Sequence, residues 1–231
     1  MYDPLLALAA FDAHWPTILV LMAGAVGFSF VYFIIAVRMA LRQRAYVVPF
    51  LGASLFLWHD LSFVLHYPEW VGTYGSHWWL MTWTIALVGT VALEAFLIWQ
   101  FIRYGRQEIM PSATQAQFAL LTVLATLGVG ATWWLVKASL DDPIYLVTFA
   151  ITAVWSVPFH TGILLRRRSR LGQSIAMEAS VIVIFACVSA VLMIVAPFFR
   201  TAPYLAFFAT FMIWPAANIA MILKAPPIPR D

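Results

Sequence analysis

Several ionisable or amide side chains stand within long apolar stretches of the sequence. Those that could do chemistry are His59, Asp60, Glu94, His160, Glu178 and Asn218. A charge in the hydrocarbon of a bilayer costs at least about 2.5 kcal/mol on insertion scales, so an ionisable residue in a membrane span suggests a function. Desolvation favours the neutral form of a carboxyl group, which suits proton donation. We therefore predict that Asp60 and Glu94 are catalytic and that the other four bind substrate.

The segment around Asp60 mixes polar and aromatic side chains at helical spacing. Asp60, Phe63 and Tyr67 fall on one face of a helix, with His59 and His66 on the adjacent face. This pattern predicts that polar and aromatic side chains lie next to each other on the inward side of the helix. Aromatic rings also stabilise positive charge through their quadrupoles. The aromatic residues expected to line a substrate pocket are Trp58, Phe63, Trp83, Trp155 and Trp214.

The polar residues also have structural interpretations. Asp60, Glu94 and Asn218 could join neighbouring helices through hydrogen bonds, as polar residues do in membrane proteins. His160 and Glu178 lie near one end of their apolar stretches, where they could pair with nearby arginines. The sequence leaves both interpretations open.

The composition excludes a water-soluble protein and several kinds of site. Of the 231 residues, 64% are hydrophobic and 10% are charged, and the mean hydropathy is +0.90, so too little polar surface is available to cover a soluble globule. The single cysteine, Cys187, excludes a disulfide framework and a thiolate metal site, and no other spacing matches a metal motif. We expect no metal and no other cofactor. The basic residues behind the net charge of +3 lie between apolar stretches, so we expect membrane lipid and not nucleic acid as a partner.

Seven stretches are long enough to cross a bilayer, which takes about 20 residues of helix. They cover residues 16–37, 46–67, 78–102, 116–136, 144–165, 173–196 and 202–223. Backbone groups must be satisfied inside a bilayer, so each stretch is expected to be helical, and Pro158 and Pro215 are expected to kink theirs. The sequence thus predicts an all-α polytopic membrane protein with seven transmembrane helices in one bundle. This single domain covers residues 1–231 with a solvated tail at 225–231, and its first helix is expected to be retained and not cleaved as a signal peptide.

Lysines and arginines lie mostly on one side of this arrangement. Eleven of them, including Arg230 in the tail, fall on that side, and only Lys137 and Arg200 fall on the other. Cytoplasmic loops are enriched in basic residues, so we expect the N-terminus to lie outside and the C-terminus in the cytoplasm. A bacterial inner membrane or the endoplasmic reticulum is the expected location.

Other classes of membrane protein are less consistent with the sequence. A retinal protein needs a lysine deep within its last span, whereas Lys224 lies at the edge of that span. No hydrolase or phosphate-binding motif is present. A small proton-coupled transporter remains an alternative, with Asp60, Glu94, His160 and Glu178 as a relay between the two membrane faces. A sensory or binding receptor is a third possibility.

Three segments resemble a known family. In the first, Trp58, His59 and Asp60 are similar to a family motif in which a Trp is followed by an acid. In the second, Glu94 precedes an Arg, aromatic, Gly pattern at residues 103–105. In the third, residues 170–174 resemble an Arg-x-Gly-Gln-Ser motif. Together they resemble the seven-span integral-membrane terpene cyclases of fungal meroterpenoid and indole-diterpenoid pathways, and their bacterial relatives. Asn218 stands where that family has a second functional acid, and Asp60 stands where it usually has Glu.

The resemblance implies a metal-independent isomerase or lyase of terpenoid biosynthesis that acts on a lipophilic prenylated small molecule. A carboxylic acid, for which Asp60 is the candidate, would protonate an epoxide or an alkene, with Glu94 assisting. The resulting carbocation would then cyclise in a dry pocket lined by aromatic side chains. Because the substrate dissolves in lipid, a pocket inside the helix bundle could receive it directly.

Overall fold

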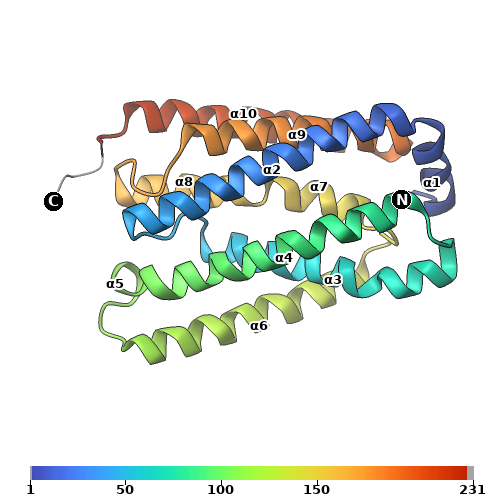
Figure 1. Ribbon diagram of the computed structural model, residues 1–231. Coiled ribbons are helices and arrows are strands. Elements are labelled where there is room, and N and C mark those ends of the chain that lie inside the picture. Colours follow the sequence, from blue (N-terminus) through green and yellow to red (C-terminus); the bar gives the residue numbers. More distant parts are fainter. Residues whose placement is uncertain (1, 228–231) are drawn as a thin grey trace.

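The computed structural model describes residues 2–227 and contains only helices and connecting segments in that range. The helices are α1 (Pro4–Ala13), α2 (Trp15–Gln43), α3 (Phe50–Tyr74), α4 (Trp78–Tyr104), α5 (Arg106–Ile109), α6 (Gln115–Ser139), α7 (Leu146–Val154), α8 (Ser156–Arg167), α9 (Ile175–Val195), a 3-10 helix (Pro197–Arg200) and α10 (Ala202–Lys224). The long helices run side by side as one elongated bundle, and α1 lies at one end of it (Figure 1). The predicted all-α membrane bundle is confirmed. Arg230 and the end of the tail lie outside the described residues.

Each of the seven predicted spans is occupied by helix. Within the described residues, six helical segments are long and apolar enough to cross a membrane: α2, α4, α6, the α7–α8 pair, α9 and α10. The remaining helix, α3, has 25 residues and is long enough, but it is less apolar than the six. Its polar residues His59, Asp60 and Ser62 are buried inside the bundle. The helix that fits a membrane least well by composition is therefore the one that carries the candidate acid.

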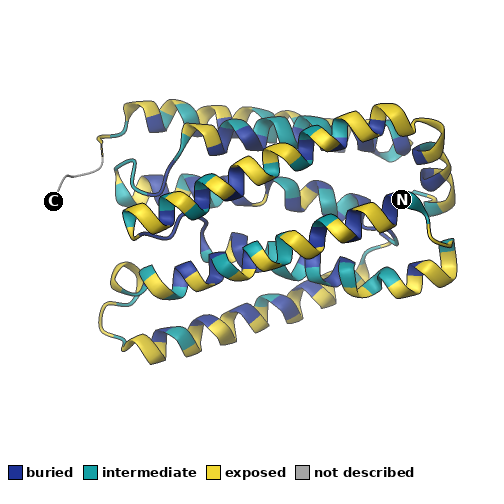
Figure 2. Cartoon of the chain, in the orientation of Figure 1, coloured by how far each residue is buried: buried dark blue, intermediate teal, exposed yellow. Residues whose placement is uncertain are grey.

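The outward faces of the long helices are apolar. Large hydrophobic side chains such as Val20, Ile85, Leu135 and Ile213 are more than 65% exposed. Figure 2 shows exposed residues along the outer sides of the helices, with buried residues facing inward. Such a surface would aggregate in water and is stable in hydrocarbon. The chain is a multi-pass membrane protein by the length and composition of its helices.

The fifth predicted span is broken into two helices. The backbone N–H of Trp155 bonds to the Thr152 carbonyl, which ends α7, and α8 begins at Ser156. Pro158 lacks an amide hydrogen, and its ring clashes with the carbonyl four residues earlier, so the break falls just before it. Pro215, in contrast, lies within α10, which continues as one helix.

The bundle has two well-packed halves with α7 and α8 between them. In one half α2 packs along α9, and α9 packs against α10; in the other α3 packs along α4 and against α6. Helices α2 and α4 face each other across the two halves but contact each other only sparsely (Figure 1). The space between the halves is therefore where a cavity can form.

A buried carboxylate fixes the start of α7 at the end of the bundle that carries α1. Asp142 is 1% exposed and accepts hydrogen bonds from the backbone N–H groups of Val147 and Thr148, at 3.1 and 2.8 Å. It also accepts a bond from the Tyr2 hydroxyl at 2.6 Å. A carboxylate near a helix N-terminus is favourable because it pairs with unsatisfied amides and the helix dipole. Burial and the Asp142 charge raise the pKa of Tyr2, so its hydroxyl stays a donor in this bond.

The close approach of α3 to α6 depends on a glycine. The indole N–H of Trp58 donates to the Thr126 carbonyl at 2.7 Å, and the ring lies over Gly130. A Cβ atom at Gly130 would be 2.2 Å from the indole, whereas one at Gly128, two residues earlier, would meet nothing within 4 Å. Trp58 therefore joins the two helices.

We predict opposite effects on stability for Gly130→Ala and Gly128→Ala. The first must displace the Trp58 ring, and overpacking of this kind typically costs about 1–3 kcal/mol. The second replaces an unobstructed helical glycine and should gain up to about 1 kcal/mol. Thermal unfolding of the purified variants in one detergent measures both. Equal melting temperatures for the two variants would contradict the packing described for Trp58.

Candidate functional site

A pocket lies between the two halves of the bundle, at the level of Asp60 and Glu94. It has about 880 Å³ of empty space, counted with its open mouth. Its wall is formed by α3 together with α2, α4, α7, α8 and α9. The lining residues are Ala25, Val26, Ser29, Phe30, Tyr32, Phe33, Phe56, Asp60, Trp83, Ala86, Leu87, Thr90, Glu94, Phe149, Thr152, Ala153, Ser156, Val181, Ile184 and Val188. Most of these side chains are apolar or aromatic. The lining is of the kind that suits a small lipophilic molecule.

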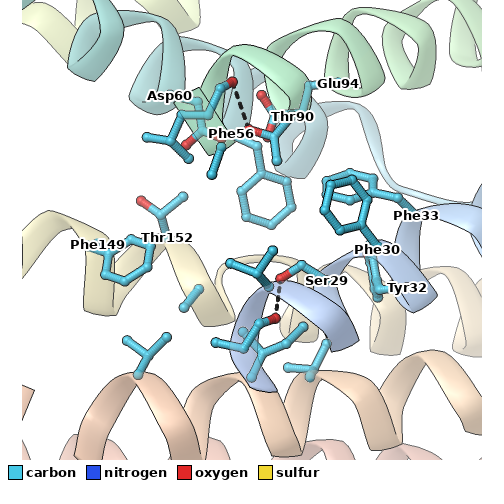
Figure 3. Close-up of a pocket in the computed structure, with 18 of the residues that line it drawn as sticks. Ser29, Phe30, Tyr32, Phe33, Phe56, Asp60, Thr90, Glu94, Phe149 and Thr152 are labelled. Carbon is cyan, nitrogen blue, oxygen red and sulfur yellow. Dashed lines mark hydrogen bonds between the residues drawn. The ribbon is translucent and has the colours of Figure 1, made fainter. Parts of the chain in front are cut away.

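Two carboxyl groups face each other in this wall. Asp60 on α3 and Glu94 on α4 are 6% and 2% exposed, and their side chains interact through charge and hydrogen bonding. Asp60 has two further partners, because Thr90 donates to its Oδ2 and His59 Nδ1 lies 2.7 Å from its Oδ1. The Oε2 atom of Glu94 is buried and has no hydrogen-bond partner in the protein. Figure 3 shows Asp60, Thr90 and Glu94 gathered on one side of the pocket.

The two carboxyl groups have different surroundings. Thr90 and His59 bond to Asp60, whereas Oε2 of Glu94 has no partner and is free to bond to a ligand. Two carboxylates at close range in a medium of low dielectric constant repel each other, so we expect the pair to share one proton beside the apolar cavity.

Aromatic rings form part of the remaining cavity wall, and aliphatic side chains form the rest. Trp83 stacks on Trp79 with centroids 5.4 Å apart, and Phe149 meets Trp83 edge-on at 4.8 Å. Phe56 and Phe33 complete this part of the wall. Ring faces that line an enclosed pocket stabilise a cation, and the effect is larger when water is excluded.

The mouth of the pocket opens sideways. Among the lining residues only Phe30 is exposed, at 45%. Phe30 lies on α2, which contacts α4 only sparsely. We infer that the pocket opens between these helices, toward the surface that faces lipid and away from the two ends of the bundle.

A second buried polar cluster adjoins the pocket. His160 Nδ1 lies 2.8 Å from Glu178 Oε1, and its Nε2 lies 3.1 Å from the hydroxyl of Tyr32. Asn218 donates to Glu178 Oε2 at 3.2 Å and accepts from Thr161 at 2.6 Å. The indole N–H of Trp214 donates to the Thr161 hydroxyl at 2.8 Å. Of this cluster only Tyr32 also lines the pocket.

The structure thus divides the residues predicted from the sequence among several places. Asp60, Glu94 and Trp83 line the pocket, and His59 lies behind Asp60 with its ring against Phe149. His160, Glu178, Asn218 and Trp214 form the second cluster.

The three other predicted aromatic residues lie outside the pocket wall. Trp58 joins α3 to α6, and Phe63 packs against Trp70 and Tyr145. Trp155, at the α7–α8 break, lines a separate apolar groove formed with α3 and α6. His160 and Glu178 pair with each other and not with the arginines at the end of α8.

Sequence reasoning missed several residues of the site. Tyr32 and Ser156 look like ordinary residues of an apolar stretch, although a phenol in mid-span needs a hydrogen-bond partner. Thr90 could have been found from its spacing, because it lies four residues before Glu94 and so on the same helix face. The pocket phenylalanines carry no signal that separates them from those facing lipid.

Comparison with protein-family models, curated proteins and solved structures gives no match for this chain. Within residues 2–227, no three side chains of His, Cys, Asp and Glu come together as a metal-ligand set. The functional argument therefore depends on the geometry of the pocket.

Infrared spectroscopy can detect the proton held by the carboxyl pair. We expect the purified protein at neutral pH to have a stretching band from a protonated carboxyl group, which Glu94→Gln removes. Asp60→Asn should shift this band, because it changes the group's hydrogen-bond partner. The matched control is Asp12→Asn, since Asp12 is an exposed carboxylate at the end of the bundle. A spectrum unchanged by either pocket variant would show that both carboxyl groups are charged.

Proposed function

We propose that this protein is a membrane-embedded terpene cyclase of the meroterpenoid type. It would protonate a prenyl epoxide or alkene and guide cyclisation of the resulting carbocation. The observation that carries the proposal is the pair of buried carboxyl groups, Asp60 and Glu94, in the wall of a mostly apolar pocket with aromatic side chains. The resemblance of residues 58–60, 94–105 and 170–174 to the family's motifs agrees with it.

The chemistry begins at the carboxyl pair. Its proton passes to the epoxide oxygen or to a carbon of the terminal alkene, and the pair then carries the negative charge of two carboxylates beside the new cation. The donors Thr90 and His59 stabilise that charge, which lowers the barrier to proton transfer. The carbocation formed then reacts with internal double bonds while the rings of Trp83 and Phe149 stabilise positive charge.

The side opening suits a lipophilic substrate. A prenylated molecule partitions into the bilayer, so a mouth at Phe30 between α2 and α4 admits it without exposing it to water. The apolar wall also excludes water, which would otherwise trap the cation as an alcohol. The substrate class we propose is a small aromatic or heterocyclic molecule that carries a polyprenyl chain.

A proton-coupled carrier is the second candidate. The second polar cluster favours it, because Tyr32 connects the pocket wall to His160 and Glu178. A carrier needs a hydrated path, however, and the wall of this pocket is mostly apolar. The predominance of apolar and aromatic lining favours catalysis.

The central prediction concerns Asp60→Asn and Glu94→Gln. Membranes containing the protein should convert ortho-farnesylphenol or its terminal epoxide into a cyclic isomer of unchanged mass. Each variant should lower the rate by at least about 100-fold, because a positioned general acid typically contributes a factor of about 100 or more. Gas chromatography with mass spectrometry measures the product. With the alkene in heavy water, one deuterium atom should appear in the product.

Asp12→Asn is the control for this experiment, since its exposed carboxylate lies away from the pocket. Full turnover in Asp60→Asn and Glu94→Gln would exclude the pair as the acid. Proton release from vesicles that depends on Asp60, without isomerisation of any probe, would instead support the carrier.

We further propose that the end of the bundle bearing α5 is cytoplasmic. The basic residues of the described chain gather there, including Arg103, Arg106, Arg166 and Arg167. The positive-inside rule then places α1 and the loop around Asp142 outside.

Cysteine labelling can test this orientation in intact cells. In a Cys187→Ser background, Ser139→Cys and Ser112→Cys place thiols near opposite ends of α6, and both positions are exposed. A membrane-impermeant maleimide should label Ser139→Cys in intact cells and Ser112→Cys only after lysis. The reverse pattern would contradict the proposed orientation.

A further inference from the structure

The second polar cluster has a defined direction of hydrogen bonding. Trp214 donates to Thr161, and Thr161 donates to the amide oxygen of Asn218. The amide nitrogen of Asn218 then donates to Glu178 Oε2. The same nitrogen also donates to the Val157 carbonyl at 3.3 Å, so turning the amide of Asn218 over would break three bonds. Glu178 is therefore held as an acceptor.

This arrangement determines the tautomer of His160. Glu178 Oε1 accepts, so the Nδ1 atom of His160, 2.8 Å away, carries the proton. The Nε2 atom is then bare and accepts from the Tyr32 hydroxyl at 3.1 Å. His160 and Glu178 are 2% and 1% exposed, so no bulk water competes for these bonds. An imidazole oriented in this way by a carboxylate can act as a base toward a phenol.

That phenol belongs to the pocket. Tyr32 lines the cavity from α2, and Ser156, another lining residue, interacts with its hydroxyl. Figure 3 shows Tyr32 beside Phe30 and Phe33, across the cavity from Asp60. A proton-donating pair and a proton-accepting chain thus lie at two different walls of one cavity.

We propose that Tyr32, His160 and Glu178 form the proton-accepting site that ends the reaction, with Asn218 as a positioning residue for Glu178. This inference rests on the proposed function and assigns its last step. The C–H bond next to the cationic carbon breaks, and its electron pair forms the new C=C bond. The released proton goes to the Tyr32 oxygen while the proton of Tyr32 moves to His160 Nε2. The imidazolium formed is paired with the Glu178 carboxylate.

The two sites account for the proton over a whole cycle. The Asp60–Glu94 pair gives up one proton at the start, and His160 gains one at the end, so the organic product is an isomer of the substrate. The carboxyl pair must regain that proton before the next cycle. A base placed away from the acid also means that the cation is quenched only when cyclisation has carried it across the pocket.

The test compares consumption of a probe with the identity of its product. Membranes with Tyr32→Phe, His160→Gln or Glu178→Gln are given the terminal epoxide of ortho-farnesylphenol. We expect consumption within about threefold of the wild type, because the acid is intact. The fraction of the wild-type alkene should fall by at least about tenfold, since a lost general base typically costs that much or more. Alcohols formed by water and other alkene isomers should replace it.

Two further variants separate this role from a structural one. Tyr204→Phe is the matched control, because Tyr204 is also buried and donates to a neighbouring helix, at Ser189, but does not line the pocket. It should leave both rate and product unchanged. Asn218→Asp removes the donor to Glu178 and should change the product mixture in the same direction as Glu178→Gln.

The outcomes distinguish the inference from the proposed function. Wild-type products from Tyr32→Phe, or consumption and product falling together in all three variants, would overturn the accepting site while leaving the cyclase in place. No conversion of the farnesylphenol or its epoxide by the wild type would remove the proposed function, and the accepting site with it.

Discussion

The cost of placing polar groups in hydrocarbon governs this structure. Every ionisable side chain in the middle of the bundle must find a partner there, because no water offers one. Asp60 meets this requirement with Glu94, Thr90 and His59, and Glu178 meets it with His160 and Asn218. Of the unpartnered buried polar atoms in residues 2–227, Oε2 of Glu94 is the one that belongs to a residue of the cavity wall. It is therefore free to bond to a ligand in the cavity.

The same requirement shapes the helices around the cavity. Helix α3 tolerates its polar residues because α4 and α6 cover them, and Gly130 lets α6 come close enough for Trp58 to donate to its backbone. On the other side, α2 and α9 pack tightly and present Tyr32 to His160. Between the two halves, in contrast, α2 and α4 contact each other only sparsely. The cavity follows from good packing within each half and poor packing between them.

The sequence predicted the spans and the two acids but not how they are grouped. Spans follow from long apolar runs, and Asp60 and Glu94 stand out because carboxyl groups are rare in such runs. Which residues group together depends on the rotation of each helix about its axis. The sequence does not determine that rotation, because these helices are apolar on all sides. Hence Trp58, adjacent to Asp60 by pattern, turns toward α6, while Tyr32 and Thr90, unremarkable in sequence, reach the cavity wall. The separation of Asn218 from the carboxyl pair likewise depends on tertiary packing.

The sideways mouth at Phe30 has a consequence for how such a protein meets its ligand. For a ligand that arrives through the lipid, the effective concentration is its amount per membrane area and not its amount per volume of buffer. Adding inert lipid or detergent at constant total ligand therefore dilutes it at the mouth, and saturation depends on its mole fraction in the membrane. A hydrophobic molecule released through the same opening stays in the membrane and competes there with other ligand molecules until another protein or partitioning into the bulk removes it.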